Sequence, residues 1–212
     1  MILYDYCRSS AAYRVRIALN LKQLDYQQQS VNLLESAHTG TEHQKRNTQK
    51  LVPVLSDQGV QLSQSLAICE YLDEAYPESL QLVTGTPVER AKIRAFAQAI
   101  ACEVHPVNNL RVLKYLVSKM GADEAQKMQW YHHWINTTFS ALEQQLSQRS
   151  NNSTFCFSEE PGLAEVCLVP QVFNARRFKL DMQAYPLLNA IDQRCQELAS
   201  FTSAHPAQQP DS

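Results

Sequence analysis

The order of strand and helix patterns changes once along this chain of 212 residues, and that change constrains the fold most. Strand and helix patterns alternate over the first 80 residues, and strand patterns are absent after residue 87. The expected strands are 2–6, 26–33, 52–56 and 60–62; the expected helices are 11–22, a short polar one after the second strand, and 63–76. A β-α-β-α-β-β-α order predicts a small mixed sheet with helices on its faces.

The second part of the chain predicts helices alone. Long amphipathic patterns cover residues 88–119, with a kink at Pro106, and residues 123–148. Shorter helices are expected over 162–177 and 186–201, followed by a loose polar tail from residue 205. We therefore predict an α/β domain over residues 1–80 and an all-α domain over residues 87–212.

Composition and charge exclude several classes of protein. A net charge of −2 gives no electrostatic basis for binding nucleic acid or an anionic membrane. The six cysteines form no C-x-x-C pair and have no histidine at zinc spacing, so neither a disulfide framework nor a metal site is expected. No segment has the apolar length of a spanning helix, and the first residues do not resemble a signal peptide. We expect a cytoplasmic protein.

Two serines stand where the first strand turns into the first helix. Arg8-Ser9-Ser10 follows the strand directly, so free backbone N–H groups and the positive end of the helix dipole face any anion there. A thiolate is such an anion, and no cysteine occupies the helix start, so a thiolate bound there would come from a ligand. The alternative is that a serine only caps the helix.

Two further segments carry groups that could bind a ligand. Val52-Pro53 precedes the third strand, where thioredoxin-like folds have a cis-proline that leaves the preceding backbone free for a peptide ligand; an ordinary trans proline is the alternative. Gln64-Ser65 opens the helix after the hairpin and could hold a carboxylate, or Ser65 could be a plain cap. All three segments are predicted to meet at one edge of the sheet.

Five motifs, in this order, resemble those of zeta-class glutathione transferases, a class that includes the maleylacetoacetate and maleylpyruvate isomerases. They are Ser-Ser-x-x-Tyr-Arg-Val-Arg-Ile-Ala-Leu (9–19), Leu-Val-Pro-Val-Leu (51–55), Gln-Ser-Leu-Ala-Ile (64–68), His-Pro-Val-Asn-Asn-Leu-Arg-Val-Leu (105–113) and Leu-Val-Pro-Gln-Val-Phe-Asn-Ala-Arg-Arg-Phe-Lys-Leu-Asp (168–181). The resemblance covers nearly the whole chain.

The resemblance implies a thioredoxin-like first domain, a helical second domain, a homodimer, and glutathione as cofactor. By position it assigns thiolate binding to Ser9 and Ser10, and the rest of glutathione to His38, Val52, Gln64, Ser65, Asn109, Leu110 and Arg111. It assigns binding of the acidic substrate to Arg8, His105 and Arg177. It also counts Arg8 as catalytic, together with Ser9 and Ser10. For Arg177 a surface salt bridge is the alternative, and for His105 a packed position at the Pro106 kink.

The chemistry needs no metal. A thiolate can add to the double bond of a cis enone diacid, which allows rotation about the resulting single bond, and can then leave. This is nucleophilic catalysis in which the ligand supplies the nucleophile. Arginines suit the carboxylates of such a substrate, because their planar fork binds two oxygens.

The chain departs from the class at a few positions. Ala11 stands where the class typically has cysteine, Thr48 replaces a proline, and residues 43–46 are more polar than expected. Gly162 replaces a capping threonine, although Glu165 can still reach back to the helix start.

The leading hypothesis is a maleylacetoacetate isomerase of tyrosine and phenylalanine catabolism. A maleylpyruvate isomerase or a general zeta-like transferase is the first alternative, and a non-catalytic glutathione transferase-like binding protein is the second.

Overall fold

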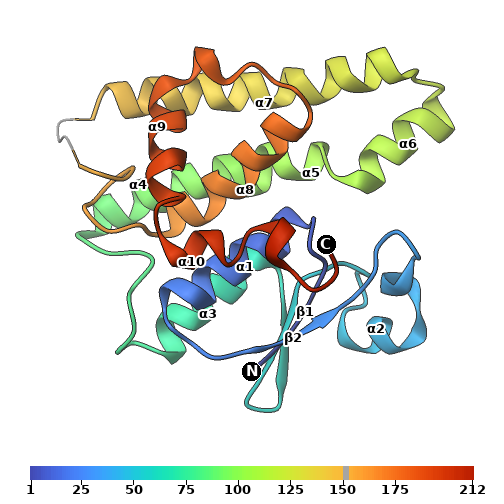
Figure 1. The fold of residues 1–212 in the computed structure, drawn as a ribbon, viewed down its shortest axis with the longest axis horizontal. Coiled ribbons are helices and arrows are strands. Elements are labelled where there is room, and N and C mark those ends of the chain that lie inside the picture. The colour runs from blue at the N-terminus through green and yellow to red at the C-terminus, as the bar shows by residue number, and fades with distance from the viewer. Residues whose placement is uncertain (150–152) are drawn as a thin grey trace. The chain divides into compact units, whose positions relative to one another are not determined.

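The computed structural model describes residues 1–149 and 153–212, which divide into two compact units (Figure 1). The first unit consists of Met1–Val83 together with Gln196–Ser212, and the second is Thr84–Cys195. The predicted division at residues 80 and 87 therefore differs from the structure in one respect: the last 17 residues pack with the α/β unit. No helix among the residues described is long and apolar enough to cross a membrane.

The first unit is built on a mixed four-stranded sheet, as the sequence predicts. Its strands are β1 (Ile2–Asp5), β2 (Gln27–Ser30), β3 (Val54–Asp57) and β4 (Val60–Ser63). They lie in the order β2-β1-β3-β4, with β1 parallel to β2 and the other pairs antiparallel. Gln58 and Gly59 both have positive φ, which is the two-residue turn that a tight hairpin between β3 and β4 requires.

Helices α1 (Ser10–Leu21) and α3 (Ser65–Ala75) pack against each other in the first unit. Most of α1 is buried, and its apolar side chains join those of the sheet and of α3 in the core. Between β2 and β3 the chain forms a 3-10 turn, η1 (Ala37–Thr39), and the short helix α2 (Thr41–Arg46).

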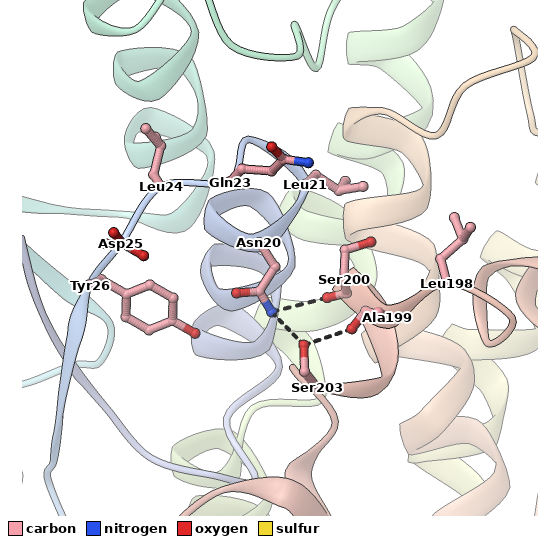
Figure 2. A pocket seen from close by; sticks show the side chains of 10 residues that line it. All are labelled: Asn20, Leu21, Gln23, Leu24, Asp25, Tyr26, Leu198, Ala199, Ser200 and Ser203. Carbon is pink, nitrogen blue, oxygen red and sulfur yellow. Dashed lines mark hydrogen bonds between the residues drawn. The ribbon is translucent and has the colours of Figure 1, made fainter.

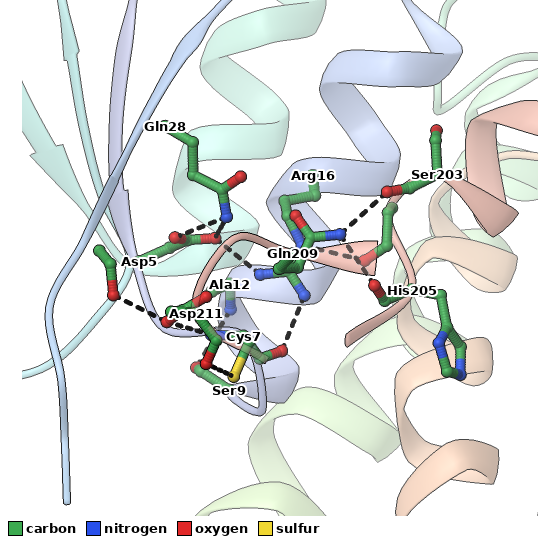
Figure 3. A network of polar contacts seen from close by, with 12 residues as sticks. Asp5, Cys7, Ser9, Ala12, Arg16, Gln28, Ser203, His205, Gln209 and Asp211 are labelled. Carbon is green, nitrogen blue, oxygen red and sulfur yellow. Dashed lines mark hydrogen bonds and ion pairs between the residues drawn. The ribbon is translucent and has the colours of Figure 1, made fainter. Parts of the chain in front are cut away.

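A buried ion pair lies inside the first unit (Figure 3). The Nη1 atom of Arg16 lies 2.6 Å from Oδ2 of Asp5, and both side chains are fully buried. The same guanidinium donates from Nη2 to the Cys7 carbonyl at 2.9 Å and from Nε to the Ala204 carbonyl at 3.0 Å. One side chain therefore joins β1, the segment that follows it, and the C-terminal segment.

The C-terminal segment is ordered by these contacts, so the expectation of a loose tail was wrong. The helix predicted over residues 186–201 is two helices, α9 (Pro186–Cys195) in the second unit and α10 (Ala199–Thr202) in the first. Helix α10 packs against α1, and the turn η4 (Pro206–Gln208) follows it (Figure 1). The Gln209 amide donates to the carbonyls of Ser203 and His205, which folds the tail back on itself.

The described part of the second unit is helical, as predicted. Its elements are α4 (Pro87–Gln98), the π-helical segment η2 (Ala99–Val104), α5 (His105–Val107), α6 (Leu110–Met120), α7 (Glu124–Ser147), α8 (Leu163–Arg177), η3 (Met182–Ala184) and α9. The kink expected at Pro106 is present as a π-helical segment followed by a break before α6. The Glu165 carboxylate accepts from the Gly162 N–H at 2.7 Å, so the glycine-started α8 retains its cap.

Arg16→Met tests how far the first unit depends on the buried ion pair. Removing one partner of such a pair leaves the other charged and unpaired, so we expect the free energy of unfolding to fall by about 3–5 kcal/mol. Urea denaturation followed by circular dichroism measures this change. Arg90→Met, at an exposed site on α4, is the matched control and should change little. Equal unfolding free energies for Arg16→Met and the unaltered protein would contradict this role.

Candidate active site

The three segments predicted to bind a ligand lie at one end of the sheet. Tyr4 of β1 pairs with Val54 of β3, and Val54 pairs in turn with Ser63 of β4. The chain therefore leaves β1, enters β3 and leaves β4 at the same end. Ser9 follows β1, Val52 precedes β3 and Gln64 follows β4, so the predicted convergence is confirmed.

Ser9 caps helix α1. Its backbone N–H donates to the Tyr6 carbonyl at 2.9 Å, which closes a tight turn over residues 6–9, here called the Tyr6–Ser9 turn. Its Oγ accepts the Ala12 N–H at 3.2 Å, as the capping alternative requires. A serine hydroxyl that accepts at a cap still has its own proton to donate, so capping and anion binding are compatible. Ser10 is buried in the first turn of α1, and Arg8 beside them is exposed.

The thiol of Cys7 is unsuited to be the nucleophile. It is 1% exposed, and its Sγ donates to the Asp211 carbonyl at 3.1 Å. Burial raises the pKa of the Cys7 thiol, and the negative charge of the nearby Asp211 carboxylate raises it further, so the thiol stays protonated. A thiolate at the start of α1 would therefore come from a ligand.

The peptide bond between Val52 and Pro53 is cis, as in thioredoxin-like folds. Val52 packs against the buried cluster of Tyr4, Val31 and Val54. The carbonyl of the preceding residue, Leu51, lies 2.9 Å from both His43 Nε2 and Asn47 Nδ2. Sequence reasoning missed this role for His43 and Asn47, because a hydrogen bond to a backbone carbonyl leaves no pattern in the sequence.

Ser65 begins α3 beside a buried cation. Its Oγ accepts from Arg14 Nη1 at 3.0 Å, and Arg14 is only 2% exposed. Because Arg14 lies one turn after Ser10, this bond draws the starts of α1 and α3 together. Two helix N-termini and a permanent positive charge therefore favour an anion here. Sequence reasoning also missed Arg14, which it treated as part of a helix motif.

Gln64 adopts a backbone conformation that is rare for a residue with a side chain. Its φ of 72° and ψ of 111° place it outside the ordinary regions, and its amide donates to Gln49 Oε1 at 2.8 Å. Such residues cluster at binding sites, where the surrounding structure holds them. His38, the remaining predicted residue of the first unit, is half-buried in η1.

An open pocket of about 640 Å³ in the first unit lies away from these residues (Figure 2). It is lined by the C-terminal end of α1, the segment up to Tyr26, and α10. The 12 residues of α1 separate it from Ser9 by roughly 18 Å at 1.5 Å per residue. This pocket is therefore distinct from the candidate site.

In the second unit, α7 holds the segment that contains Asn109. Trp130 Nε1 donates to the Val107 carbonyl, and Asn108 donates to the Tyr131 carbonyl, both at 3.0 Å. Asn109 caps α6 by accepting the Arg111 N–H at 3.1 Å. Leu110 and Arg111 are exposed in the first turn of α6, and His105 is half-buried at the start of α5.

Arg177 ends α8 and is exposed, with its guanidinium 5.3 Å from the centre of the Phe178 ring. A salt bridge at this end of α8 is made by the residue before Arg177: Arg176 pairs with Asp192 at 2.6 Å. The Phe178 ring lies 3.9 Å from that of Tyr131, centre to centre. Tyr131 therefore connects the Arg177 end of α8 to the Asn108–Asn109 segment.

Comparisons with known proteins agree with this arrangement. The family described as glutathione S-transferase, N-terminal domain, matches residues 1–74. A probable maleylacetoacetate isomerase of Vibrio cholerae is 47% identical over 100% of this chain and 98% of its own length. A maleylpyruvate isomerase of a Ralstonia species is 42% identical over the whole of both chains.

Solved structures show the same likeness. The holo structure of a maleylpyruvate isomerase, described as a bacterial zeta-class glutathione S-transferase, has a TM-score of 0.97 and 42% identity over the whole of both chains. A maleylacetoacetate isomerase of Methylobacterium extorquens, solved with malonate and glutathione bound, has a TM-score of 0.95 and 32% identity over 100% of this chain and 99% of its own. With a cis-proline and a serine-started helix at the same end of a mixed sheet, and with relatives of this kind along its full length, the chain belongs to the zeta class of the glutathione transferase family.

Proposed function

We propose that this protein is a glutathione-dependent cis–trans isomerase that converts maleylacetoacetate to fumarylacetoacetate in the breakdown of tyrosine and phenylalanine. The observation that carries the proposal is the convergence of Ser9, Val52 and Gln64–Ser65 at one end of the sheet. The Vibrio cholerae relative, a probable maleylacetoacetate isomerase, supports the choice of substrate.

The residues at this end of the sheet fit the chemical groups of glutathione. The Ser9 hydroxyl has a proton to donate to a thiolate, with Ser10 beside it, and Val52 offers a peptide backbone next to the cis bond. Gln64 and the start of α3 at Ser65, with Arg14 behind it, suit the γ-glutamyl carboxylate. On the resemblance to the class, we assign binding of the glycyl end of glutathione to His38. On the same ground we assign further contacts with glutathione to Asn109, Leu110 and Arg111.

When bound, glutathione supplies a thiolate that adds reversibly to the substrate double bond. Ser9 lowers the energy of that thiolate by donating a hydrogen bond, and the positive end of α1 acts in the same direction. We assign Arg8, His105 and Arg177 to the substrate carboxylates. Arg8 and Arg177 are both exposed, which leaves their planar guanidinium groups accessible to a diacid.

Maleylpyruvate is the second candidate substrate. The Ralstonia maleylpyruvate isomerase matches this chain along its whole length, and Ala11 provides no thiol in the first turn of α1. Both substrates are short cis diacids with the same need for carboxylate binding. A general zeta-like transferase activity toward other electrophiles would use the same thiolate.

We also infer a homodimer in a reducing, cytoplasmic environment. All six cysteines are free thiols, which supports a reducing compartment, and the dimer rests on the resemblance to the class. Sedimentation equilibrium should give twice the chain mass of 24.1 kDa. A mass equal to one chain at micromolar concentration would contradict the dimer.

Turnover of the two diacids tests the proposed reaction. We expect the absorbance of the conjugated enone of maleylacetoacetate to change only when both protein and glutathione are present, because the protein offers no thiolate of its own at Ser9. Maleylpyruvate is measured in parallel, and faster turnover of it would select the second candidate. If glutathione binds but neither diacid reacts, the protein is instead a binding protein without this activity.

Ser9 variants separate thiolate binding from helix capping. Ser9→Ala removes both functions, so we expect the rate to fall on the order of a hundred-fold, with a loss of about 1 kcal/mol of stability. Ser9→Asp keeps a cap but has no proton to donate when ionised, so it should recover stability and not rate. Thr86→Ala, which removes the hydroxyl cap of α4, is the control for cap loss and should keep the rate. An unchanged rate in Ser9→Ala would refute the role of Ser9.

A further inference from the structure

We propose that Asp211, in the C-terminal tail, is a positioning residue that holds the Tyr6–Ser9 turn and thereby sets the place of the Ser9 hydroxyl. The inference rests on the proposed function, because it assigns the tail a part in forming the thiolate site.

Asp211 contacts the turn through Cys7, two residues before Ser9 (Figure 3). Its Oδ2 accepts the Cys7 backbone N–H at 3.1 Å, and its carbonyl accepts from Cys7 Sγ, also at 3.1 Å. The remaining polar group of Cys7, its carbonyl, accepts from Arg16 Nη2 at 2.9 Å. The tail therefore holds the N–H of Cys7, and Arg16 holds the carbonyl of Cys7, so both backbone groups of this turn residue are fixed.

The tail that presents Asp211 is itself anchored. Arg16 Nε donates to the Ala204 carbonyl at 3.0 Å, so the residue that holds the Cys7 carbonyl also holds the tail. The Ser30 hydroxyl, at the end of β2, donates to Asp211 Oδ2 at 2.8 Å. Asp211 is thus fixed to the end of β2 through Ser30, and the tail that carries it is fixed to α1 through Arg16.

Stability alone does not account for a carboxylate at this position. Among the residues that the structure describes, Oδ1 of Asp211 is buried and accepts no hydrogen bond. A buried charged oxygen without a donor lowers stability. A carboxyl group beside the turn that leads into Ser9 is explained if its other oxygen, Oδ2, must hold that turn in one place.

The effect expected of Asp211 falls on one part of the site. The tail contacts the turn before Ser9, whereas the groups assigned to the rest of glutathione flank other strands: Val52 precedes β3, and Gln64–Ser65 follows β4. Moving the turn should disturb the thiolate and leave most of the binding energy of glutathione in place. This predicts a change in kcat with little change in KM for glutathione.

Asp211→Ala in the full-length protein tests the proposal. We expect kcat to fall on the order of ten- to a hundred-fold, because small displacements of a catalytic group cost that much. The KM for glutathione should change by less than about twofold. The pKa of the thiol of bound glutathione, followed by its ultraviolet thiolate absorbance, should rise, which a merely structural role would not cause.

Three further variants complete the test. Asp211→Asn has the same shape and keeps an acceptor for Cys7, so it should restore kcat. Asp211→Glu moves the carboxylate outward by one methylene and should lower kcat, which provides a test if Asp211→Ala does not fold. Ser30→Ala removes the bond that anchors Asp211 Oδ2 to β2, so it should raise the thiol pKa in the same direction as Asp211→Ala but by less.

The outcomes distinguish this proposal from the proposed function. If the unaltered protein neither binds glutathione nor isomerises either diacid, the proposed function fails. If the unaltered protein is active and folded Asp211→Ala and Asp211→Glu keep its kcat and its glutathione thiol pKa, the role of Asp211 is overturned.

Discussion

The buried guanidinium of Arg16 is the contact on which the rest of the first unit depends. Removing a permanent charge from water is costly, and the cost is recovered only when the charge is paired and its donors are used. Asp5 supplies the opposite charge, and the carbonyls of Cys7 and Ala204 take two more donors. The end of β1, the Tyr6–Ser9 turn and the tail are therefore fixed by one side chain, and α1, which carries it, is fixed with them.

The candidate site uses helix starts and backbone far more than it uses reactive side chains. Ser9 and Ser65 each begin a helix, Val52 offers main-chain groups, and Gln64 is held at positive φ. The groups in such a site suit an elongated, anionic, peptide-like molecule, and Cys7 adds no nucleophile because it is buried and its thiol pKa is raised. A chain of this kind catalyses only the chemistry that its ligand provides.

Much of this arrangement could be predicted from the sequence, because it follows from local patterns. Strand and helix periodicity, the Gln58–Gly59 turn and the residues flanking each strand fix the sheet and bring Ser9, Val52 and Gln64 to one end. What was missed is long-range and polar. Cys7 and Asp211 are 204 positions apart, and His43 and Asn47 act on a backbone carbonyl, so neither contact leaves a periodic signal. The tail looked loose for the same reason: its polar residues resemble those of a disordered end until their partners are known.

The discontinuous first unit has a consequence for how the protein is made. A ribosome releases the N-terminal residues first, and domains usually fold as they emerge. Here Ala204, which accepts from Arg16, and Asp211, which holds Cys7, follow the whole second unit in the sequence. The sheet can begin to assemble early, but the turn that precedes Ser9 gains its contacts only after the whole helical unit has been translated. The contacts that hold the Tyr6–Ser9 turn therefore depend on residues made after the second unit, and a chain that stops before residue 204 cannot form them.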